Sequence, residues 1–196
     1  MTYKDILKIA VNLLIIYTVG GLLLALVYAK TSPIIFKNNE RFKQESLQKM
    51  IPEAGNNDIR KLGDWQPHEK HAEYYEARKD GVFLGYIVQS FGKGYSSYID
   101  VLFAVDESFK IKSVNILHHS ETPGLGDEIE SDKFKGQFKG KDVEHLKVQK
   151  VETTEYVQSI TGATISSRAV SEDAIKKGLE FLKESLKGGA NTNVAP

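Results

Sequence analysis

The sequence predicts an α+β protein: a single N-terminal transmembrane helix followed by one domain with an antiparallel sheet and flanking helices. Three features favour this class. An uncharged apolar run stands near the N-terminus, several strand-like runs separated by turn signals fill the middle, and an amphipathic run precedes the C-terminus. With 196 residues and one such anchor, the chain has room for a single domain of ordinary size.

The composition excludes several classes of function. Lysine plus arginine number 26 and aspartate plus glutamate number 26, so no overall basic field favours nucleic acid, and none is predicted as a partner. The sequence contains no cysteine, which removes thiol catalysis, thiolate metal sites, iron–sulfur ligation and disulfides. If the protein moves electrons, a cofactor that needs no cysteine ligand must carry them.

The apolar run at residues 9–29 contains 21 residues without a formal charge. As a helix it would be about 31 Å long, which matches a hydrocarbon core of about 30 Å. A cleaved signal peptide is the alternative, but Val27-Tyr28-Ala29 poorly matches a small-x-small cleavage site. We therefore predict a short N-terminal segment at residues 1–8 and an uncleaved transmembrane helix at residues 9–29. The flanking basic residues do not decide its orientation.

Residues 30–70 are expected to connect this anchor to the domain and to contain one helix. Pro33 predicts an interruption of the first helix, because proline removes a backbone donor and clashes with the preceding turn. From Phe36 to Met50 a polar-rich helical pattern resumes, with its apolar residues on one side. Residues 52–67, which begin and end in proline, are predicted to form a loop and short connector.

Residues 71–187 are expected to form the domain, and its first half has the pattern of strands. Asp80-Gly81 is a strong hairpin signal, and residues 106–108 are predicted to turn the third strand into the fourth. The predicted strands are Ala72–Arg78, Val82–Phe91, Tyr98–Val105 and Ile111–His118.

The second half of the domain is predicted to be mainly helical. Ser131–Phe138 is expected to form a short helix and Leu146–Val151 a further strand. The final helix is predicted over about Ser167 to Lys187, and residues 188–196 are predicted to be a disordered tail that begins with two glycines. One apolar stripe at helical spacing defines the buried side of the final helix: Ile175, Leu179, Leu182 and Leu186.

A hydroxyl-rich stretch precedes this final helix, with the sequence Ser159-Ile160-Thr161-Gly162-Ala163-Thr164-Ile165-Ser166-Ser167. Helix N-termini present unpaired N–H groups and a partial positive charge, which stabilise a phosphate. Local chemistry alone, however, favours an ordinary Ser/Thr helix cap. The stretch by itself therefore leaves both interpretations open.

A second stretch, from His119 to Gly126, follows the last strand of the predicted sheet. Its proline and two glycines indicate a tight loop in which backbone N–H groups approach a ligand closely. A planar, partly apolar ring could rest on Pro123 and Leu125, with Glu121 or the backbone at its polar edge. A simple turn with a surface carboxylate is the alternative.

Together the two stretches resemble a known family. Thr161-Gly162-Ala163-Thr164 resembles the flavinylation motif of the FMN-binding domain shared by the G subunit of Rnf electron transport complexes and the C subunit of Nqr complexes. Glu121-Thr122-Pro123-Gly124-Leu125-Gly126 resembles the second signature of the same family. The resemblance implies FMN attached through a phosphoester to Thr164. The other residues that it assigns to the FMN site are Tyr95, Glu121, Thr122, Pro123, Gly124, Leu125, Gly126, Thr161, Gly162, Ala163, Ser166 and Ser167.

The resemblance also implies a function and a setting. It places residues 1–8 in the cytoplasm and the FMN-binding domain on the extracytoplasmic side of the cell membrane. The expected role is electron relay between other membrane subunits of an Rnf-type ferredoxin:NAD oxidoreductase that transports Na⁺ or H⁺, after a flavin transferase has attached the FMN. The chain's length favours Rnf over the alternative, an Nqr-type NADH:quinone reductase. A membrane-anchored binding module without redox chemistry is the third possibility.

The chain departs from the family pattern at two places. Gln158 stands where the family often has an aspartate, and Gly94-Tyr95-Ser96-Ser97 replaces a Gly-Tyr-Gly-Gly turn. The adjacent pair His118-His119 invites a metal hypothesis, but neighbouring side chains of a strand point to opposite faces. His68 and His71 stand in a segment bounded by proline and predicted to be irregular. No metal site is therefore predicted.

Overall fold

The fold is taken from a computed structural model, which describes residues 3–55 and 57–189 of the chain. The chain divides into two compact units, residues 1–42 and residues 43–196. The first unit contains the greater part of one long helix. The second unit contains the sheet, the remaining helices and the candidate site.

The helix α1 (Tyr3–Met50) is continuous, and its last residues, 43–50, belong to the second unit. By length and composition it is able to cross a membrane, and it includes the predicted span at residues 9–29. The predicted interruption at Pro33 is wrong, because Pro33 lies inside α1. Proline leaves one carbonyl of the preceding turn without its donor, but in so long a helix the bonds on both sides of that gap maintain the helical conformation.

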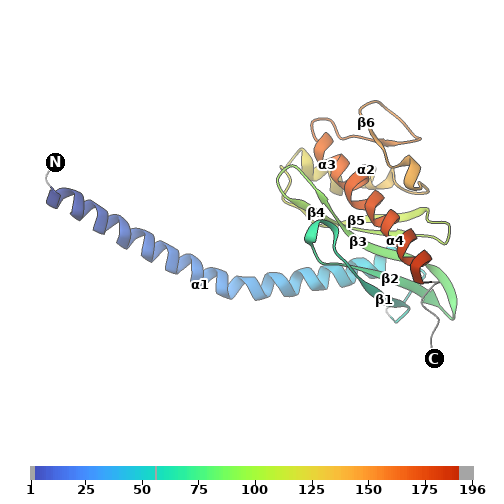
Figure 1. The fold of residues 1–196 in the computed structure, drawn as a ribbon, viewed down its shortest axis with the longest axis horizontal. Coiled ribbons are helices and arrows are strands. Elements are labelled where there is room, and N and C mark those ends of the chain that lie inside the picture. The colour runs from blue at the N-terminus through green and yellow to red at the C-terminus, as the bar shows by residue number, and fades with distance from the viewer. Residues whose placement is uncertain (1–2, 56, 190–196) are drawn as a thin grey trace. The chain divides into compact units, whose positions relative to one another are not determined.

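The second unit is built on one antiparallel sheet in which neighbours in sequence are neighbours in space, in the order β1-β2-β3-β4-β5 (Figure 1). Two of the four predicted strands have the predicted bounds, and the other two are extended at their C-terminal ends. The strands are β1 (Ile59–Trp65), β2 (Ala72–Lys79), β3 (Val82–Lys93), β4 (Tyr98–Val105) and β5 (Ile111–His118).

Both turns that the residue types predict are confirmed. Asp80 and Gly81 have φ of 51° and 81°, and left-handed residues at both central positions define the hairpin turn that suits twisted strands. Between β4 and β5, the Asp106 carboxylate accepts hydrogen bonds from the N–H groups of Ser108 and Lys110, both at 2.9 Å. A side chain that bonds its own turn in this way fixes the chain reversal.

Helices cover both faces of the sheet. One face packs against the end of α1, through Leu47 and Met50, and against Ile51, which directly follows α1. The other face packs against a continuous helical run and against α2, and the helical run crosses the sheet in Figure 1. The run begins at Thr164, three residues before the predicted start. The helical run consists of α3 (Thr164–Arg168), the π-helix η4 (Ala169–Ile175) and α4 (Lys176–Gly189). The short helices are α2 (Asp132–Gly136) and three turns of 3₁₀ helix, η1 (Pro67–Glu69), η2 (Gly126–Glu130) and η3 (Val143–His145).

The predicted apolar stripe of the final helix is confirmed, since Ile175, Leu179 and Leu182 are fully buried. The disordered tail predicted for residues 188–196 differs from the structure at its first two residues. Residues 188–189 are the end of α4, and residues 190–196 lie outside the described part of the chain.

Three short elements differ from the prediction. The expected loop at residues 52–67 contains β1, whose sequence IRKLGDW lacks regular alternation and whose register shifts between Lys61 and Gly63. The expected strand Leu146–Val151 shortens to β6 (Val148–Gln149), which pairs in parallel with the unpredicted β7 (Val157–Gln158). Two-residue strands carry too little periodicity to be recognised in a sequence.

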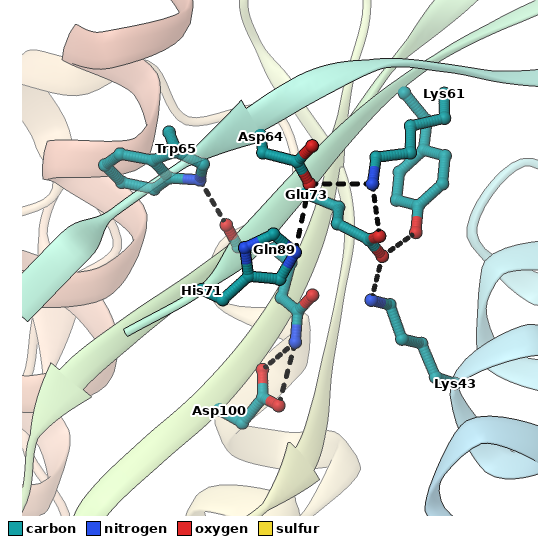
Figure 2. Close-up of polar contacts among 9 residues, drawn as sticks. Lys43, Lys61, Asp64, Trp65, His71, Glu73, Gln89 and Asp100 are labelled. Atoms are coloured by element: carbon teal, nitrogen blue, oxygen red, sulfur yellow. Dashed lines mark hydrogen bonds and ion pairs between the residues drawn. The ribbon is translucent and has the colours of Figure 1, made fainter. Parts of the chain in front are cut away.

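An ion-pair network fixes the end of α1 to the sheet. Glu73 of β2 pairs with the ammonium groups of Lys43 on α1 and Lys61 on β1, and accepts a hydrogen bond from Tyr75 (Figure 2). Burial raises the pKa of Glu73, but these three partners outweigh it and hold the pKa at about 2. The carboxylate therefore stays charged at physiological pH and links three elements.

Candidate functional site

A cavity of about 710 Å³ lies where four segments of the second unit meet. These are the turn between β3 and β4, the loop after β5, the residue after β6, and the stretch that leads from β7 into α3. Its volume falls within the range of about 300–1,000 Å³ typical of small-molecule sites. It is lined by Tyr95, Glu121, Thr122, Leu125, Gly126, Lys150, Ser159, Thr161, Gly162, Ala163, Thr164, Ile165 and Ser166.

The two sequence motifs form one continuous wall of this cavity. Gly162 has φ of 81°, and a Cβ placed on it would lie 2.9 Å from Cδ1 of Leu125. A Cβ on Gly126 would lie 2.8 Å from Cβ of Glu121 and 3.1 Å from Oγ of Ser166. Glycines at these positions therefore allow the loop after β5 and the stretch before α3 to pack directly against each other.

Glu121 joins the two motifs to the turn between β3 and β4. Its buried carboxylate accepts hydrogen bonds from the N–H groups of Tyr95 (3.1 Å) and Ser96 (3.0 Å), and from the hydroxyl of Ser166. Burial raises the pKa of Glu121, but the hydrogen bonds from Ser166 and from these backbone N–H groups outweigh it, so the pKa lies below its usual value. Both carboxylate oxygens are thus engaged by protein donors.

The stretch between β7 and α3 is held by its own hydrogen bonds. The hydroxyl of Ser167 accepts from the N–H of Ile160 (3.0 Å) and donates to the carbonyl of Ala163 (2.9 Å). The N–H of Ala163 donates to the carbonyl of Ile160 at 3.0 Å. The backbone of residues 160–163 therefore follows a path that is defined by the protein itself.

Thr164 is the first residue of α3, and its side chain is half-buried at the cavity wall. The residue before it, Ala163, takes the capping position, where no side chain forms a capping hydrogen bond. The structure therefore does not support an ordinary Ser/Thr cap as the reason for this stretch. A helix of this kind leaves its first N–H groups without intrahelical acceptors, so an anion beside Thr164 is favoured.

Comparisons with known proteins identify the family. The FMN-binding domain family model matches residues 94–180. The chain is 33% identical to the G subunit of the proton-translocating ferredoxin:NAD(+) oxidoreductase complex of Clostridium ljungdahlii, over 90% of this chain and 91% of that protein. The chain belongs to the Rnf G-subunit family. Two further family members are the G subunits of the ion-translocating oxidoreductase complex of Methanosarcina acetivorans (29%, over 91% and 95%) and of the Na(+)-translocating ferredoxin:NAD(+) oxidoreductase complex of Acetobacterium woodii (30%, over 86% and 88%).

A crystal structure supports the fold that is expected for this family. The NqrC of Shewanella oneidensis superposes with a TM-score of 0.57, covering 74% of this chain and 98% of that one, at 20% identity. The predicted class, α+β with a long apolar N-terminal helix and an antiparallel FMN-binding domain, is confirmed. At this identity the likeness concerns the fold alone.

In this member of the Rnf G-subunit family, most of the site residues predicted from the sequence line the same cavity. Pro123 and Gly124 belong to the same loop but do not line the cavity, and Ser167 is buried with its hydroxyl engaged as described. The predicted residues that do line it are Tyr95, Glu121, Thr122, Leu125, Gly126, Thr161, Gly162, Ala163, Thr164 and Ser166.

Three lining residues were not predicted: Lys150, Ser159 and Ile165. Ser159 and Ile165 belong to the hydroxyl-rich stretch, so their place in that stretch could have indicated that they line the site. Lys150 follows β6, and no motif connects it to the site. Its side chain is exposed and is the one basic side chain among the described residues that line the cavity.

The lining suits a group that is part ring and part phosphate. Tyr95, Leu125 and Ile165 are exposed and present apolar surface at the cavity, on which a planar ring can pack. Thr164 offers a hydroxyl at a helix N-terminus, where a phosphate is favoured. The residues present therefore fit FMN.

A separate group of polar side chains lies away from this cavity. Asp64, His71 and Glu73 bring potential metal ligands within 4.8 Å of one another, and Figure 2 shows this group. The ammonium of Lys61 already lies 2.7 Å from Asp64 and 2.5 Å from Glu73, and Lys43 pairs with Glu73. Because these lysines supply the positive charge that the carboxylates attract, we assign the group to an ion-pair network.

Proposed function

We propose that this protein is the membrane-anchored flavoprotein subunit of an Rnf-type ion-translocating ferredoxin:NAD oxidoreductase, with FMN attached covalently to Thr164. The observation that carries the proposal is the convergence of the two motifs on one cavity, with Thr164 at its wall. FMN, when bound, supplies one- and two-electron chemistry. The protein contributes the anchor, the pocket and the attachment point.

The attachment is a group transfer that needs a second enzyme and FAD. The Thr164 Oγ displaces AMP from the FMN phosphorus of FAD. One Thr–O–P ester bond forms, the pyrophosphate P–O bond breaks, AMP leaves, and the hydroxyl proton passes to a base of the flavin transferase. The positive end of the helix at Thr164 stabilises the remaining phosphate charge.

The side chains that line the cavity have distinct roles in this proposal. Leu125, Ile165 and Tyr95 would supply the apolar and aromatic surface on which the ring packs. Thr122 and Thr161 present hydroxyls at the wall, and Glu121 holds these segments in register. Thr164 takes no part in turnover, because its oxygen serves as a tether.

The setting follows from the family and from α1. The relatives are subunits of multi-subunit oxidoreductase complexes, and α1 is able to span a membrane. We propose a single pass through the cell membrane, with residues 43–196 on the extracytoplasmic side. The partners are other membrane subunits and, during maturation, the flavin transferase. An Nqr-type complex is the second candidate, supported by the fold of NqrC alone; the identity of co-purifying subunits separates the two.

Thr164→Ala tests the attachment site. After co-expression with a flavin transferase, the wild-type protein is expected to carry an FMN-sized mass adduct and to fluoresce on a denaturing gel, whereas the variant carries neither. Thr154→Ala, which removes an exposed threonine outside the cavity, is the matched control and is expected to keep the adduct. An adduct in Thr164→Ala would refute the site. A wild-type protein without an adduct would favour a binding module without redox chemistry.

A further inference from the structure

Strand β7 has two edges, and in the described part of the chain only one of them pairs with a strand. The N–H groups of Val157 and Ser159 donate to the carbonyls of Lys147 (3.1 Å) and Gln149 (2.8 Å) along the β6 edge. Successive backbone groups of a strand point to opposite sides, so Gln158 presents its N–H and C=O to the other edge. Within the described residues, no strand pairs with that edge.

A side chain takes the place of the missing strand. The Oε1 of Gln137 accepts a hydrogen bond from the N–H of Gln158 at 2.8 Å, and its Nε2 donates to the carbonyl of Gln158 at 3.3 Å. A glutamine amide offers one acceptor and two donors in a plane, as a peptide group offers one of each. Gln137 therefore binds Gln158 as a neighbouring strand would.

The support behind Gln137 is rigid. Gln137 follows α2 directly, between Phe134 and Phe138, and both phenylalanines are almost fully buried in the core. Their rings pack edge to face with centroids 5.4 Å apart. Because buried aromatic anchors on both sides hold the backbone of Gln137, its amide is presented to β7 in a fixed position.

Gln158 stands immediately before the stretch that ends at Thr164. Ser167 fixes that stretch at its far end, through Ile160 and Ala163, and Gln137 fixes it where it begins. Between these two points Thr161 and Gly162 are exposed. The stretch is thus held in one conformation by side chains that do not line the cavity themselves.

We propose that Gln137 is a positioning residue for the modification of Thr164: its amide closes the free edge of β7 and so presents the acceptor threonine to the flavin transferase in a preorganised conformation. The inference rests on the proposed attachment of FMN to Thr164. Preorganisation favours modification because the enzyme then meets the reactive conformation without first having to order the stretch.

Hydrogen exchange tests the structural half of this proposal on the full-length protein before any flavin is attached. In Gln137→Ala the backbone N–H of Gln158 is expected to exchange with solvent about tenfold faster or more than in the wild type. This is the effect of losing one or two hydrogen bonds of ordinary net strength. Gln149→Ala is the matched control: it removes the same side chain from the strand paired with β7 while leaving the contacts of Gln137 intact. In Gln149→Ala the backbone N–H of Gln158 is expected to exchange at the wild-type rate. Equal exchange rates in the wild type, Gln137→Ala and Gln149→Ala would overturn the proposal.

Modification kinetics test the functional half. With transferase and FAD at fixed concentrations, the initial rate of flavin attachment is expected to fall about tenfold in Gln137→Ala and to stay at the wild-type value in Gln149→Ala. Gln137→Glu, which keeps the size and the acceptor but loses the donor, is expected to show an intermediate rate and remains informative if the alanine variant fails to fold. A wild-type rate in Gln137→Ala or Gln137→Glu overturns this inference alone. A wild-type protein that is never modified overturns the proposed function as well.

Discussion

At the scale of single residues, two carboxylates of the domain experience opposite environments. Glu121 accepts hydrogen bonds from three protein donors, and its pKa is lowered. Asp100 on β4 has one neutral donor, the Nε2 of Gln89, at 3.0 and 2.9 Å from its two oxygens (Figure 2). Burial raises its pKa to about 6, although Gln89, Lys43 and Lys70 act in the opposite direction. Hydrogen bonds therefore outweigh burial at Glu121, whereas burial outweighs the hydrogen bond of Gln89 at Asp100.

Glu121→Gln is expected to destabilise the protein by about 1–3 kcal/mol at pH 7, because an amide cannot accept from all three donors and leaves one of them unpaired. Since the folded pKa of Glu121 is lowered, its charge stabilises the fold at neutral pH, and this contribution disappears as the pH falls below about 4. Urea unfolding at pH 7 and at lower pH measures the difference. Glu152→Gln, an exposed position, is the control, and an equal effect of both substitutions would contradict this role of Glu121.

Asp100→Asn is expected to act in the opposite direction. The folded pKa of Asp100, about 6, exceeds its unfolded value of about 3.9, so the charged form costs stability above pH 6 and the cost vanishes below pH 4. Asparagine carries no charge, and its amide oxygen can still accept the hydrogen bond that Nε2 of Gln89 donates to Asp100. Stability should rise by about 1–3 kcal/mol at pH 8, with the gain shrinking towards pH 4. Destabilisation at every pH would refute this account.

At the scale of elements, the π-helix η4 connects α3 to the sheet. Three consecutive side chains bond three backbone groups: Ser171 donates to Leu146 (2.6 Å), Glu172 accepts from Val148 (2.7 Å), and Asp173 accepts from Lys93 (2.7 Å). In a regular α-helix, three consecutive side chains point in directions 100° apart around the axis. The π-helix has a wider turn, so the directions of these three side chains differ from those of an α-helix. The element therefore fixes α3, and with it Thr164, against β3 and β6.

Gly92→Ala tests the contact between β3 and η4. A Cβ on Gly92 would lie 1.9 Å from the carbonyl oxygen of Ala169, so the backbones must separate, and we expect a loss of about 3 kcal/mol or more in the free energy of unfolding. Gly136→Ala is the control, since a Cβ there meets nothing within 4 Å. It should leave stability unchanged or raise it by up to about 1 kcal/mol. A tolerated Gly92→Ala would show that η4 can move away from the sheet.

At the scale of the whole molecule, the segment matched by the FMN-binding family model and the second compact unit begin at different residues. The family model begins at residue 94, whereas the second compact unit begins at residue 43. The residues before 71 supply β1, the ion pairs of Glu73 and the apolar cover of one sheet face. The unit that carries the site thus includes the end of α1.

Two fragments test this difference. Residues 43–189 are expected to unfold cooperatively in urea, because they retain both covers of the sheet. Residues 71–187 are expected to show no cooperative transition, because they expose the sheet face that Leu47, Met50 and Ile51 cover and leave Glu73 without its lysines. Near-ultraviolet circular dichroism provides a second readout. Equal midpoints for the two fragments would show that the residues before 71 are dispensable.

The elements that can be predicted from the amino-acid sequence are those whose signals are local. Strand-like runs between turn signals located β2 to β5, helical spacing located the buried stripe of α4, and Asp80-Gly81 defined a hairpin. The sequence also pointed to most of the cavity wall, because the loop at residues 121–126 and the stretch at residues 159–167 each carry a compact motif. Such signals depend on neighbours within a few residues, so no knowledge of the fold is needed to recognise them.

Which groups contact one another across the fold followed from the packing of distant segments. That packing placed Lys150 at the cavity, engaged the hydroxyl of Ser167 inside the protein, and set the amide of Gln137 against Gln158. It also formed β1 and the pair β6–β7, whose residues have weak strand patterns of their own. These outcomes depend on hydrogen bonds between segments that are distant in sequence, and a backbone or side-chain group that loses water finds its partner only when packing brings that partner near.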